Sequence, residues 1–441
     1  MKILKTLIAT LLIFCIILPF GVVFAENPPI LSAVSAILID GKTGNILYEK
    51  DSEREMYPAS TTKIITYLVI SDAIEEGEIS LDDMLTFTRE MQDKMDSDGS
   101  HIELKAGEKM SVENLIRAML IASGNDAATL LATTVGGNEE NFVKRMNQKA
   151  DELGLIHSHF TNAHGLTDPD HFTTAKDLAT AAKVAMEDDF FRQIVGSKTL
   201  NIAPTNKTEN ERYFINTNNL VSYLRYSNYY YSKATGIKTG YTDAAGSCLV
   251  ASATQKDRDL ICVVLKSEHS HEEAKALLEY GFNNFKQVEI AKKGDILGET
   301  KVKQGAGVDH VRAVAKENIV ITLPLDANVD DIKSTIKYSS DEVYAPVKKG
   351  DTLGTITYTY GKKVVGTSKI VAEKEVKRHI FGFLMTLGEK IWGLTIVKVI
   401  VYLLLTLVIL FILLVVYGFY LSIKRSKARK RRRKKYHPPL Y

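Results

Sequence analysis

Residues 57–63 read Tyr57-Pro58-Ala59-Ser60-Thr61-Thr62-Lys63, and an apolar, helix-like run follows as far as Glu76. Proline and serine favour a helix start here, so Ser60 is expected on the first helical turn. Residues three apart share one helix face, which places Lys63 within reach of the Ser60 hydroxyl. The helix N-terminus also offers backbone N–H groups to developing negative charge. Alone, the Ser-x-x-Lys pattern is weak, because most instances are a helix cap followed by a surface lysine.

Two further short motifs follow. Ser123-Gly124-Asn125 lies where a helix is expected to give way to a loop, and Lys238-Thr239-Gly240 opens an expected strand. Each alone is ordinary, since Ser-Gly-Asn is usually a turn and a strand glycine can simply allow close approach of another chain or a ligand. In this order, however, the three motifs match the signature of penicillin-binding proteins and class A β-lactamases. Gly124 replaces the Asp of the general second motif.

The chain resembles the low-molecular-mass penicillin-binding proteins, the serine D-alanyl-D-alanine carboxypeptidases, in which Ser-Gly-Asn is the usual second motif. The resemblance covers roughly residues 30–375 and includes segments outside the motifs, namely Asn162–Leu166, His171–Ala179, Gly236–Thr242 and Ala345–Asp351. It implies an α/β fold: a β-lactamase/DD-peptidase-like serine acyltransferase domain with an antiparallel sheet flanked by helices, then a small all-β domain and a C-terminal transmembrane helix.

The resemblance also implies a role for each catalytic residue. Ser60 would be the nucleophile and Lys63 the general base, which requires a neutral Lys63 and hence a lowered pKa. Lys238 in the same cleft would disfavour the charged form of Lys63, and partial burial would add to this effect. Ser123 would relay a proton to the leaving group.

The remaining motif residues would bind substrate. Asn125 would hold a peptide carbonyl or side chain, while Lys238 and the Thr239 hydroxyl would bind the terminal carboxylate. Gly240 can allow another chain or a ligand to approach the site closely. The backbone N–H groups of Ser60 and Tyr241 would form the oxyanion hole. A site for a free carboxylate suits a carboxypeptidase, which must recognise a chain end.

Two alternatives remain open. A class A-type β-lactamase would share the acylation step but needs a glutamate to activate the deacylating water. Between residues 155 and 186 the acidic residues are Asp168, Asp170 and Asp177, with no Glu-x-x-Leu-Asn run. The other alternative, a catalytically inactive cell-wall-binding homologue, is disfavoured because all three motifs are intact.

Other reactive side chains give weaker signals. The pairs His157/His159 and His269/His271 lack a third ligand at fixed spacing, so we expect no metal and no cofactor. Cys248 and Cys262 fall on neighbouring predicted strands, where two buried free thiols are favoured over a disulfide.

The pattern outside the motifs predicts strands on both sides of a helical middle. The expected elements are a hairpin at residues 33–48, several helices between 112 and 185, strands from 237 to 265 and a helix at 272–282. Early and late strands that can pair indicate an α/β or α+β domain, which we place at residues 26–284. Short strand-like runs at 288–290, 308–314, 319–323, 336–338 and 355–360, punctuated by glycine, then predict a small all-β domain at residues 285–375, without a catalytic constellation.

The two ends of the chain predict its location. Residues 1–25 have the pattern of a secretory signal peptide, with an uncleaved anchor helix as the alternative. Residues 399–423 carry no charge and are long enough to cross a membrane. Ten of the twelve residues from Lys424 to Lys435 are basic. By the positive-inside rule, the tail at 424–441 stays in the cytoplasm and the catalytic domain lies outside the cell membrane.

The segment before the span, residues 376–398, shows apolar residues at helical spacing. We expect an amphipathic juxtamembrane helix, with a helix packed on the protein body as the alternative.

The formal net charge of the chain, +3, is the sum of a basic tail and an acidic body. A basic block directly after a span indicates topology and attraction to membrane lipid rather than nucleic-acid binding.

Together, these features predict a membrane-anchored serine D,D-carboxypeptidase. It would remove the terminal D-alanine from peptidoglycan stem pentapeptides through an acyl-enzyme on Ser60, and so limit cross-linking. β-lactam antibiotics would be covalent inhibitors.

Overall fold

The computed structural model describes residues 27–97, 99–340, 342–379, 384 and 395–436. The predicted signal peptide at 1–25 lies outside these residues, as does most of the predicted juxtamembrane helix. The chain divides into two compact units. The first takes in residues up to Ala291 together with 318–334 and 357–367, and the second takes in 292–317, 335–356 and residues from Ser368 onward.

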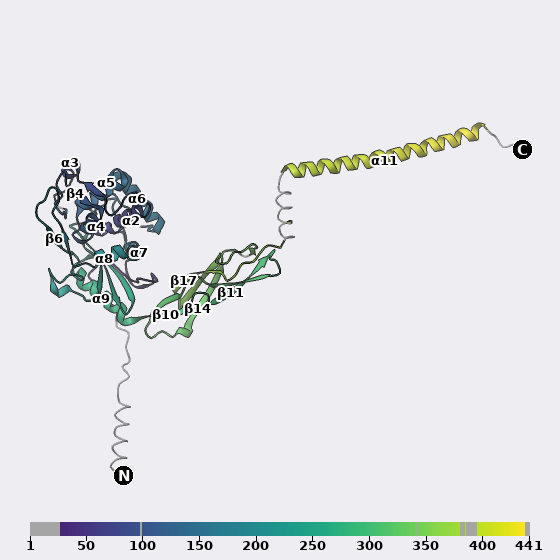
Figure 1. Ribbon diagram of the computed structural model, residues 1–441. Coiled ribbons are helices and arrows are strands. Elements are labelled where there is room, and N and C mark those ends of the chain that lie inside the picture. The colour runs from purple at the N-terminus through teal and green to yellow at the C-terminus, as the bar shows by residue number, and fades with distance from the viewer. Residues whose placement is uncertain (1–26, 98, 341, 380–383, 385–394, 437–441) are drawn as a thin grey trace, which may run out of the picture. The chain divides into compact units, whose positions relative to one another are not determined.

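A five-stranded antiparallel sheet forms the centre of the first unit (Figure 1). Its order is β2-β1-β9-β8-β7, with bounds β1 (Ser35–Asp40), β2 (Ile46–Lys50), β7 (Ala234–Thr242), β8 (Gly246–Gln255) and β9 (Arg258–Ser267). The first strand pairs with the last, so that Leu38 lies opposite Cys262. This confirms the predicted hairpin and the pairing of early with late strands. The two cysteines are free and buried, as expected.

Helices cover both faces of this sheet, as the alternation of side chains along a strand requires. Ile37 and Val263 face a core shared with the helical middle, whereas Leu38 and Cys262 face a second core under α9 (Ser270–Asn284). The elements on the first face are η1 (Ala59–Thr62), α2 (Lys63–Glu75), α3 (Arg89–Asp93), α4 (Val112–Ile121), α5 (Asn125–Gly136), α6 (Glu139–Leu153), α7 (Ala175–Ala185) and α8 (Asp189–Val195). The first unit also contains two small antiparallel two-stranded sheets, β3 (Met84–Thr86) with β4 (Lys109–Ser111) and β5 (Thr199–Ile202) with β6 (Arg212–Ile215). A short 3₁₀ turn, η2 (Ser227–Tyr229), precedes β7.

The all-β region begins directly after α9. Its strands are β10 (Phe285–Ala291), β11 (Ile296–Lys303), β12 (His310–Ala315), β13 (Ile319–Pro324), β14 (Ile332–Tyr338), β15 (Val343–Tyr344), β16 (Thr352–Tyr360) and β17 (Lys363–Ala372), with η3 (Val329–Asp331) before β14. β10 pairs with β13, and the other six form a sheet of order β14-β16-β17-β12-β11-β15. Isolated bridges join Val376 to Val347 and Arg378 to Gly305, so extended backbone pairing continues past residue 375.

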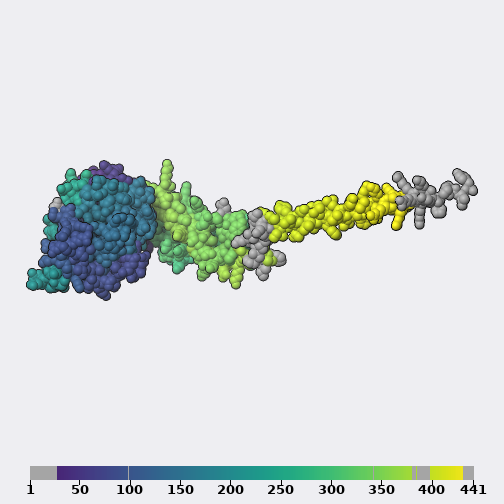
Figure 2. All heavy atoms as spheres, turned by 90° about the horizontal axis from the view of Figure 1, so that it is seen from above, coloured from purple at the N-terminus to yellow at the C-terminus, as the bar shows by residue number. Residues whose placement is uncertain are grey.

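The C-terminal helix α11 runs from Thr395 to Tyr436. Its Lys398–Lys430 portion is long and apolar enough to cross a membrane, and none of its apolar window is buried by other described residues (Figure 2). The helix continues beyond Ile423 into the basic block. Arginine, lysine and alanine there are good helix formers, so nothing in that sequence ends the helix.

Candidate active site

The structure brings the three motifs together where η1 and α2 begin, beside strand β7. Ser60 lies in the 3₁₀ turn η1, and Lys63 is the first residue of α2. Lys63 Nζ lies 3.0 Å from Ser60 Oγ. The spacing prediction for this pair is therefore confirmed, although the turn that carries Ser60 is 3₁₀ rather than α-helical.

The Lys63 amine has three hydrogen-bond partners. Besides Ser60 Oγ, its Nζ donates to Asn125 Oδ1 and to the backbone carbonyl oxygen of His164, each at 2.7 Å. A charged ammonium can donate to all three partners. A neutral amine has two N–H groups, so bonds to Asn125 and His164 leave its lone pair directed at the Ser60 hydroxyl. The arrangement therefore suits a lysine that accepts the serine proton.

Burial favours this neutral form. The Lys63 side chain is fully buried, and that burial, followed by the charge of Lys238, holds the pKa of Lys63 well below its ordinary value. The nearby Asp126 carboxylate acts in the opposite direction. From the sequence, the charge of Lys238 was the first expected cause of the lowered Lys63 pKa, and only partial burial was expected. In the structure burial is complete and is the larger cause.

The third motif supplies a second buried lysine. Lys238 is 1% exposed, and burial lowers the pKa of its ammonium to about 7. Its Nζ donates to the Thr239 carbonyl oxygen at 3.0 Å. The Thr239 hydroxyl donates to Thr217 Oγ1 at 2.7 Å, which fixes the hydroxyl beside the cleft. Thr217 was not among the residues selected from the sequence.

Strand β7 passes η1 with almost no space between the two backbones. A Cβ built on Gly240 would lie 3.0 Å from the Ser60 nitrogen and 3.1 Å from the Ala59 Cβ. A glycine is therefore required by close approach, as the sequence suggested. The next residue, Tyr241, is largely exposed.

The second motif forms the start of α5. Ser123 is buried and has a left-handed φ of 62°, and its hydroxyl makes no hydrogen bond to the described residues. The buried carboxylate of Asp126 accepts backbone N–H bonds from Ile102 and Leu104. Asp126 thus ties the segment before α4 to the first turn of α5, where Asn125 meets Lys63.

Comparison with known proteins decides the family. A family model described as D-alanyl-D-alanine carboxypeptidase matches residues 22–269, which is more than half of the chain. The chain belongs to the D-alanyl-D-alanine carboxypeptidase family. A second model, described as the penicillin-binding protein 5 C-terminal domain, matches residues 285–378.

Similar proteins cover nearly the whole body of this carboxypeptidase family member. The D-alanyl-D-alanine carboxypeptidase DacF of Bacillus subtilis is 33% identical over 86% of this chain and 96% of its own length. DacA of Haemophilus influenzae is 29% identical over 81% of this chain and 89% of its own. The crystal structure of penicillin-binding protein 5 from Haemophilus influenzae is 29% identical, with a TM-score of 0.68 over 80% of this chain and all of that one.

Several residues around this carboxypeptidase site were not predicted from the sequence. The segment 162–166 was noted as family-like but received no role, yet it supplies the His164 carbonyl to Lys63. A Cβ on Gly165 would come within 1.9 Å of the Ala59 carbonyl oxygen, so this loop packs tightly behind the nucleophile. His171 accepts the Thr161 N–H at Nδ1 and bonds Thr62 Oγ1 through Nε2 at 2.8 Å.

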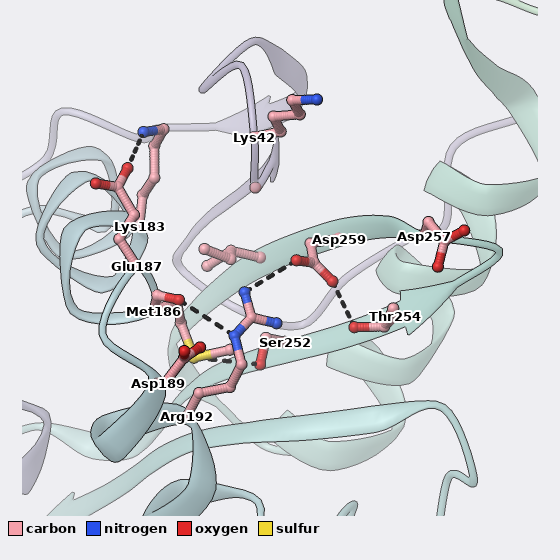
Figure 3. A pocket seen from close by; sticks show the side chains of 12 residues that line it. Lys42, Lys183, Met186, Glu187, Asp189, Arg192, Ser252, Thr254, Asp257 and Asp259 are labelled. Carbon is pink, nitrogen blue, oxygen red and sulfur yellow. Dashed lines mark hydrogen bonds and ion pairs between the residues drawn. The ribbon is translucent and has the colours of Figure 1, made fainter.

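A cavity of about 610 Å³ lies apart from the three motifs, and none of the motif residues lines it (Figure 3). Four of the seven charged side chains in its lining form ion pairs with one another, Arg192 with Asp259 and Lys183 with Glu187, and Asp259 also accepts from Thr254.

Proposed function

We propose that this serine D-alanyl-D-alanine carboxypeptidase removes the terminal D-alanine from peptidoglycan stem pentapeptides through an acyl-enzyme on Ser60. Cleaved stems cannot donate their terminal bond to transpeptidation, so the reaction limits cross-linking. The observation that carries the proposal is the 3.0 Å contact between Ser60 Oγ and the buried Lys63 Nζ. A serine becomes a nucleophile when an adjacent neutral base takes its proton.

The reaction has two halves. In the first, Ser60 Oγ attacks the carbonyl carbon of the penultimate D-alanine while Lys63 takes the hydroxyl proton. The backbone N–H groups of Ser60 and Tyr241 stabilise the oxyanion. The peptide C–N bond then breaks, and the proton that Lys63 took passes through Ser123 to the departing D-alanine nitrogen, which leaves Lys63 neutral again. In the second half, water attacks the ester carbonyl while Lys63 takes one of its protons. The bond from the carbonyl carbon to Ser60 Oγ then breaks, and Lys63 returns the proton to Ser60 Oγ.

The other motif residues hold the two sides of the scissile bond. Lys238 and the Thr239 hydroxyl bind the terminal carboxylate, because a free chain end needs a cation and a donor. For this, the Thr239 hydroxyl turns its proton from Thr217 to the carboxylate, and the Thr217 hydroxyl donates to Thr239 in return. Asn125 already uses its Oδ1 on Lys63, so its Nδ2 remains to donate to a substrate peptide carbonyl. β-lactam antibiotics acylate the same serine and remain attached.

Labelling with a fluorescent penicillin tests this assignment. The wild type and a Ser227→Ala control, which changes an exposed serine, should label equally. Ser60→Ala should not label, and labelling of that variant would reject Ser60 as the nucleophile. A synthetic stem pentapeptide should lose one D-alanine per turnover. Rapid penicillin hydrolysis without D-alanine release would instead favour the β-lactamase alternative.

We further propose the domain boundaries and the membrane topology of the chain. Residues 26–284 form the catalytic domain and 285–375 a β domain, a division supported by the two matched family models. Residues 399–423 cross the cell membrane, residues 376–398 lie at its outer interface, and the tail at 424–441 is cytoplasmic. The uncharged stretch of α11 followed by the basic block supports this orientation. Protease added outside intact cells should remove the body and spare the tail, whereas loss of the tail alone would reverse the topology.

A further inference from the structure

A cavity of about 700 Å³ begins at two residues that hold the catalytic lysine. Its lining includes Asn125, whose Oδ1 bonds Lys63, and His164, whose carbonyl oxygen does the same. This volume lies in the range typical of ligand-binding pockets. From Asn125 and His164 the cavity follows one side of α5, between that helix and the segment that contains α3.

One polar stripe of α5 faces the cavity. Asn125, Thr129 and Thr133 all line it, and their spacing of four residues puts them on a single helix face. At 1.5 Å per residue the stripe extends about 12 Å from the Lys63 contact. An extended peptide covers about 3.3 Å per residue, so the stripe has the length of three to four residues.

Thr129 in the middle of this stripe lacks a partner. Its side chain is 4% exposed, and its Oγ1 makes no hydrogen bond to any residue that the structure describes. Buried hydroxyls are nearly always paired, because an unpaired one loses its water without compensation. A ligand polar group in the cavity would supply the missing partner.

The charge of the cavity lining indicates what kind of ligand fits. Among the described residues that line the cavity, one lysine, Lys94, is outnumbered by four acidic residues, which are Glu90, Asp96, Glu139 and Glu140. Glu90 pairs with Lys94, and Glu140 pairs with Lys144 outside the lining. Glu139 forms no ion pair with another described residue. Its charge helps raise the pKa of Lys94, but that lysine is paired with Glu90, so the Glu139 carboxylate is available to a cationic ligand.

We propose that this cavity binds the positively charged side chain of a diamino acid in the acyl portion of the stem peptide. The proposal rests on the function proposed above, because it extends the substrate path from Asn125 along α5. The ammonium group meets the acidic lining at Glu139, and a polar group of the peptide bonds Thr129. Substrates with an uncharged residue at that position are therefore cleaved less efficiently.

The first test compares two synthetic pentapeptides with lysine or norleucine at the third position, which differ by the ammonium group. The wild type should show a kcat/KM about fivefold higher for the lysine peptide, as expected of one partly exposed ion pair. Glu139→Gln should reduce this preference by at least half. Asp151 lies near the other end of α6, the helix that Glu139 begins, about 18 Å from Glu139. Asp151→Asn should therefore retain the preference for the lysine peptide.

The outcomes separate the two proposals. Equal kcat/KM values for both peptides in the wild type would overturn the cavity assignment while leaving the carboxypeptidase reaction intact. Cleavage of neither peptide would overturn the proposed function itself. An unchanged lysine preference in Glu139→Gln would also reject the cavity as the site of charge recognition.

A second test uses Thr129→Val, which removes the unpaired hydroxyl at constant volume. Its folded state should be as stable as the wild type or more so, because a buried orphan donor is removed. Its KM for the lysine peptide should nevertheless rise about fivefold. Thr208→Val removes another buried, unpaired hydroxyl that does not line the cavity and should leave KM unchanged. An unchanged KM in Thr129→Val would show that no ligand group uses that hydroxyl.

Discussion

Gly240 and Ser60 lie so close that a Cβ on Gly240 would be 3.0 Å from the Ser60 backbone nitrogen. The same Cβ would be 2.9 Å from the Pro58 carbonyl oxygen. Both neighbours are backbone atoms and cannot swing aside as a flexible side chain would. The position of strand β7 against the nucleophile is therefore set by the absence of a side chain at one residue.

Gly240→Ala should displace β7 or η1 by a few tenths of an ångström without unfolding the sheet. Because misplacement of catalytic groups by about 1 Å can cost a hundredfold, we expect the penicillin acylation rate to fall by about tenfold to a hundredfold. Stopped-flow acylation and a thermal unfolding midpoint measure the two effects. Gly418→Ala, with open space around its Cβ, is the control and should acylate normally. A normal rate in Gly240→Ala would show that this contact does not position the site.

The predictable part of the site consists of residues whose types and spacing carry the chemistry. Ser60 and Lys63 are three apart at a helix start, so local geometry alone places them together. The bond from Lys63 to the His164 carbonyl joins residues 101 apart. A backbone carbonyl leaves no mark on residue type, and this partner could not be predicted. Full burial of Lys63 likewise depends on the packing of distant segments.

Prediction of the strands was limited in the same way, because distant parts of the chain stabilise some of them. Strand β1 of the predicted hairpin 33–48 and strands β8 and β9 within 237–265 are largely buried, and their apolar patterns are strong. Strands β11 and β17 were missed because most of their residues are exposed or only partly buried, with lysine, threonine and serine interrupting the pattern. Strands of this kind are stabilised by cross-strand partners that a linear sequence does not identify.

Lys63→Arg separates a general base from a simple positive charge. Arginine keeps the charge but does not deprotonate at working pH, so it cannot accept the Ser60 proton. We expect the acylation rate to fall by about 10²- to 10⁴-fold, measured with the fluorescent penicillin. The exposed Lys176, which pairs with Glu53, offers a control, and Lys176→Arg should acylate normally. Acylation of Lys63→Arg at a rate near that of the wild type would remove Lys63 as the base.

The pH profile of kcat/KM should report both lysines. Protonation of Lys63 removes the base, so the rate falls on the acid side. Burial lowers the pKa of Lys238 to about 7, so above that pH the free enzyme loses the ammonium that binds the terminal carboxylate. We expect kcat/KM to decline by about tenfold per pH unit on the alkaline side. In kcat the decline should start at higher pH, because bound carboxylate favours the charged lysine.

Lys238→Arg provides the check on this assignment. Its guanidinium stays charged, so the alkaline decline in kcat/KM should move upward by at least one pH unit or disappear. Steady-state release of D-alanine from the pentapeptide between pH 5 and 10 measures the shift. An alkaline limb at the same pH in wild type and variant would assign that limb to another group.

His171 should make the folded state sensitive to acid. Burial lowers the pKa of His171 from 6.5 to about 4, and its Nδ1 accepts the Thr161 N–H, so Nε2 carries the proton toward Thr62. Between those pH values the unfolded chain binds the extra proton and the folded chain does not, so stability falls as pH falls, by up to about 3 kcal/mol. Denaturant unfolding from pH 7 to 4 should show a shallower decline in His171→Asn. The variant His269→Asn, which changes an exposed histidine, should keep the wild-type slope, and equal slopes for all three proteins would exclude His171 as the source.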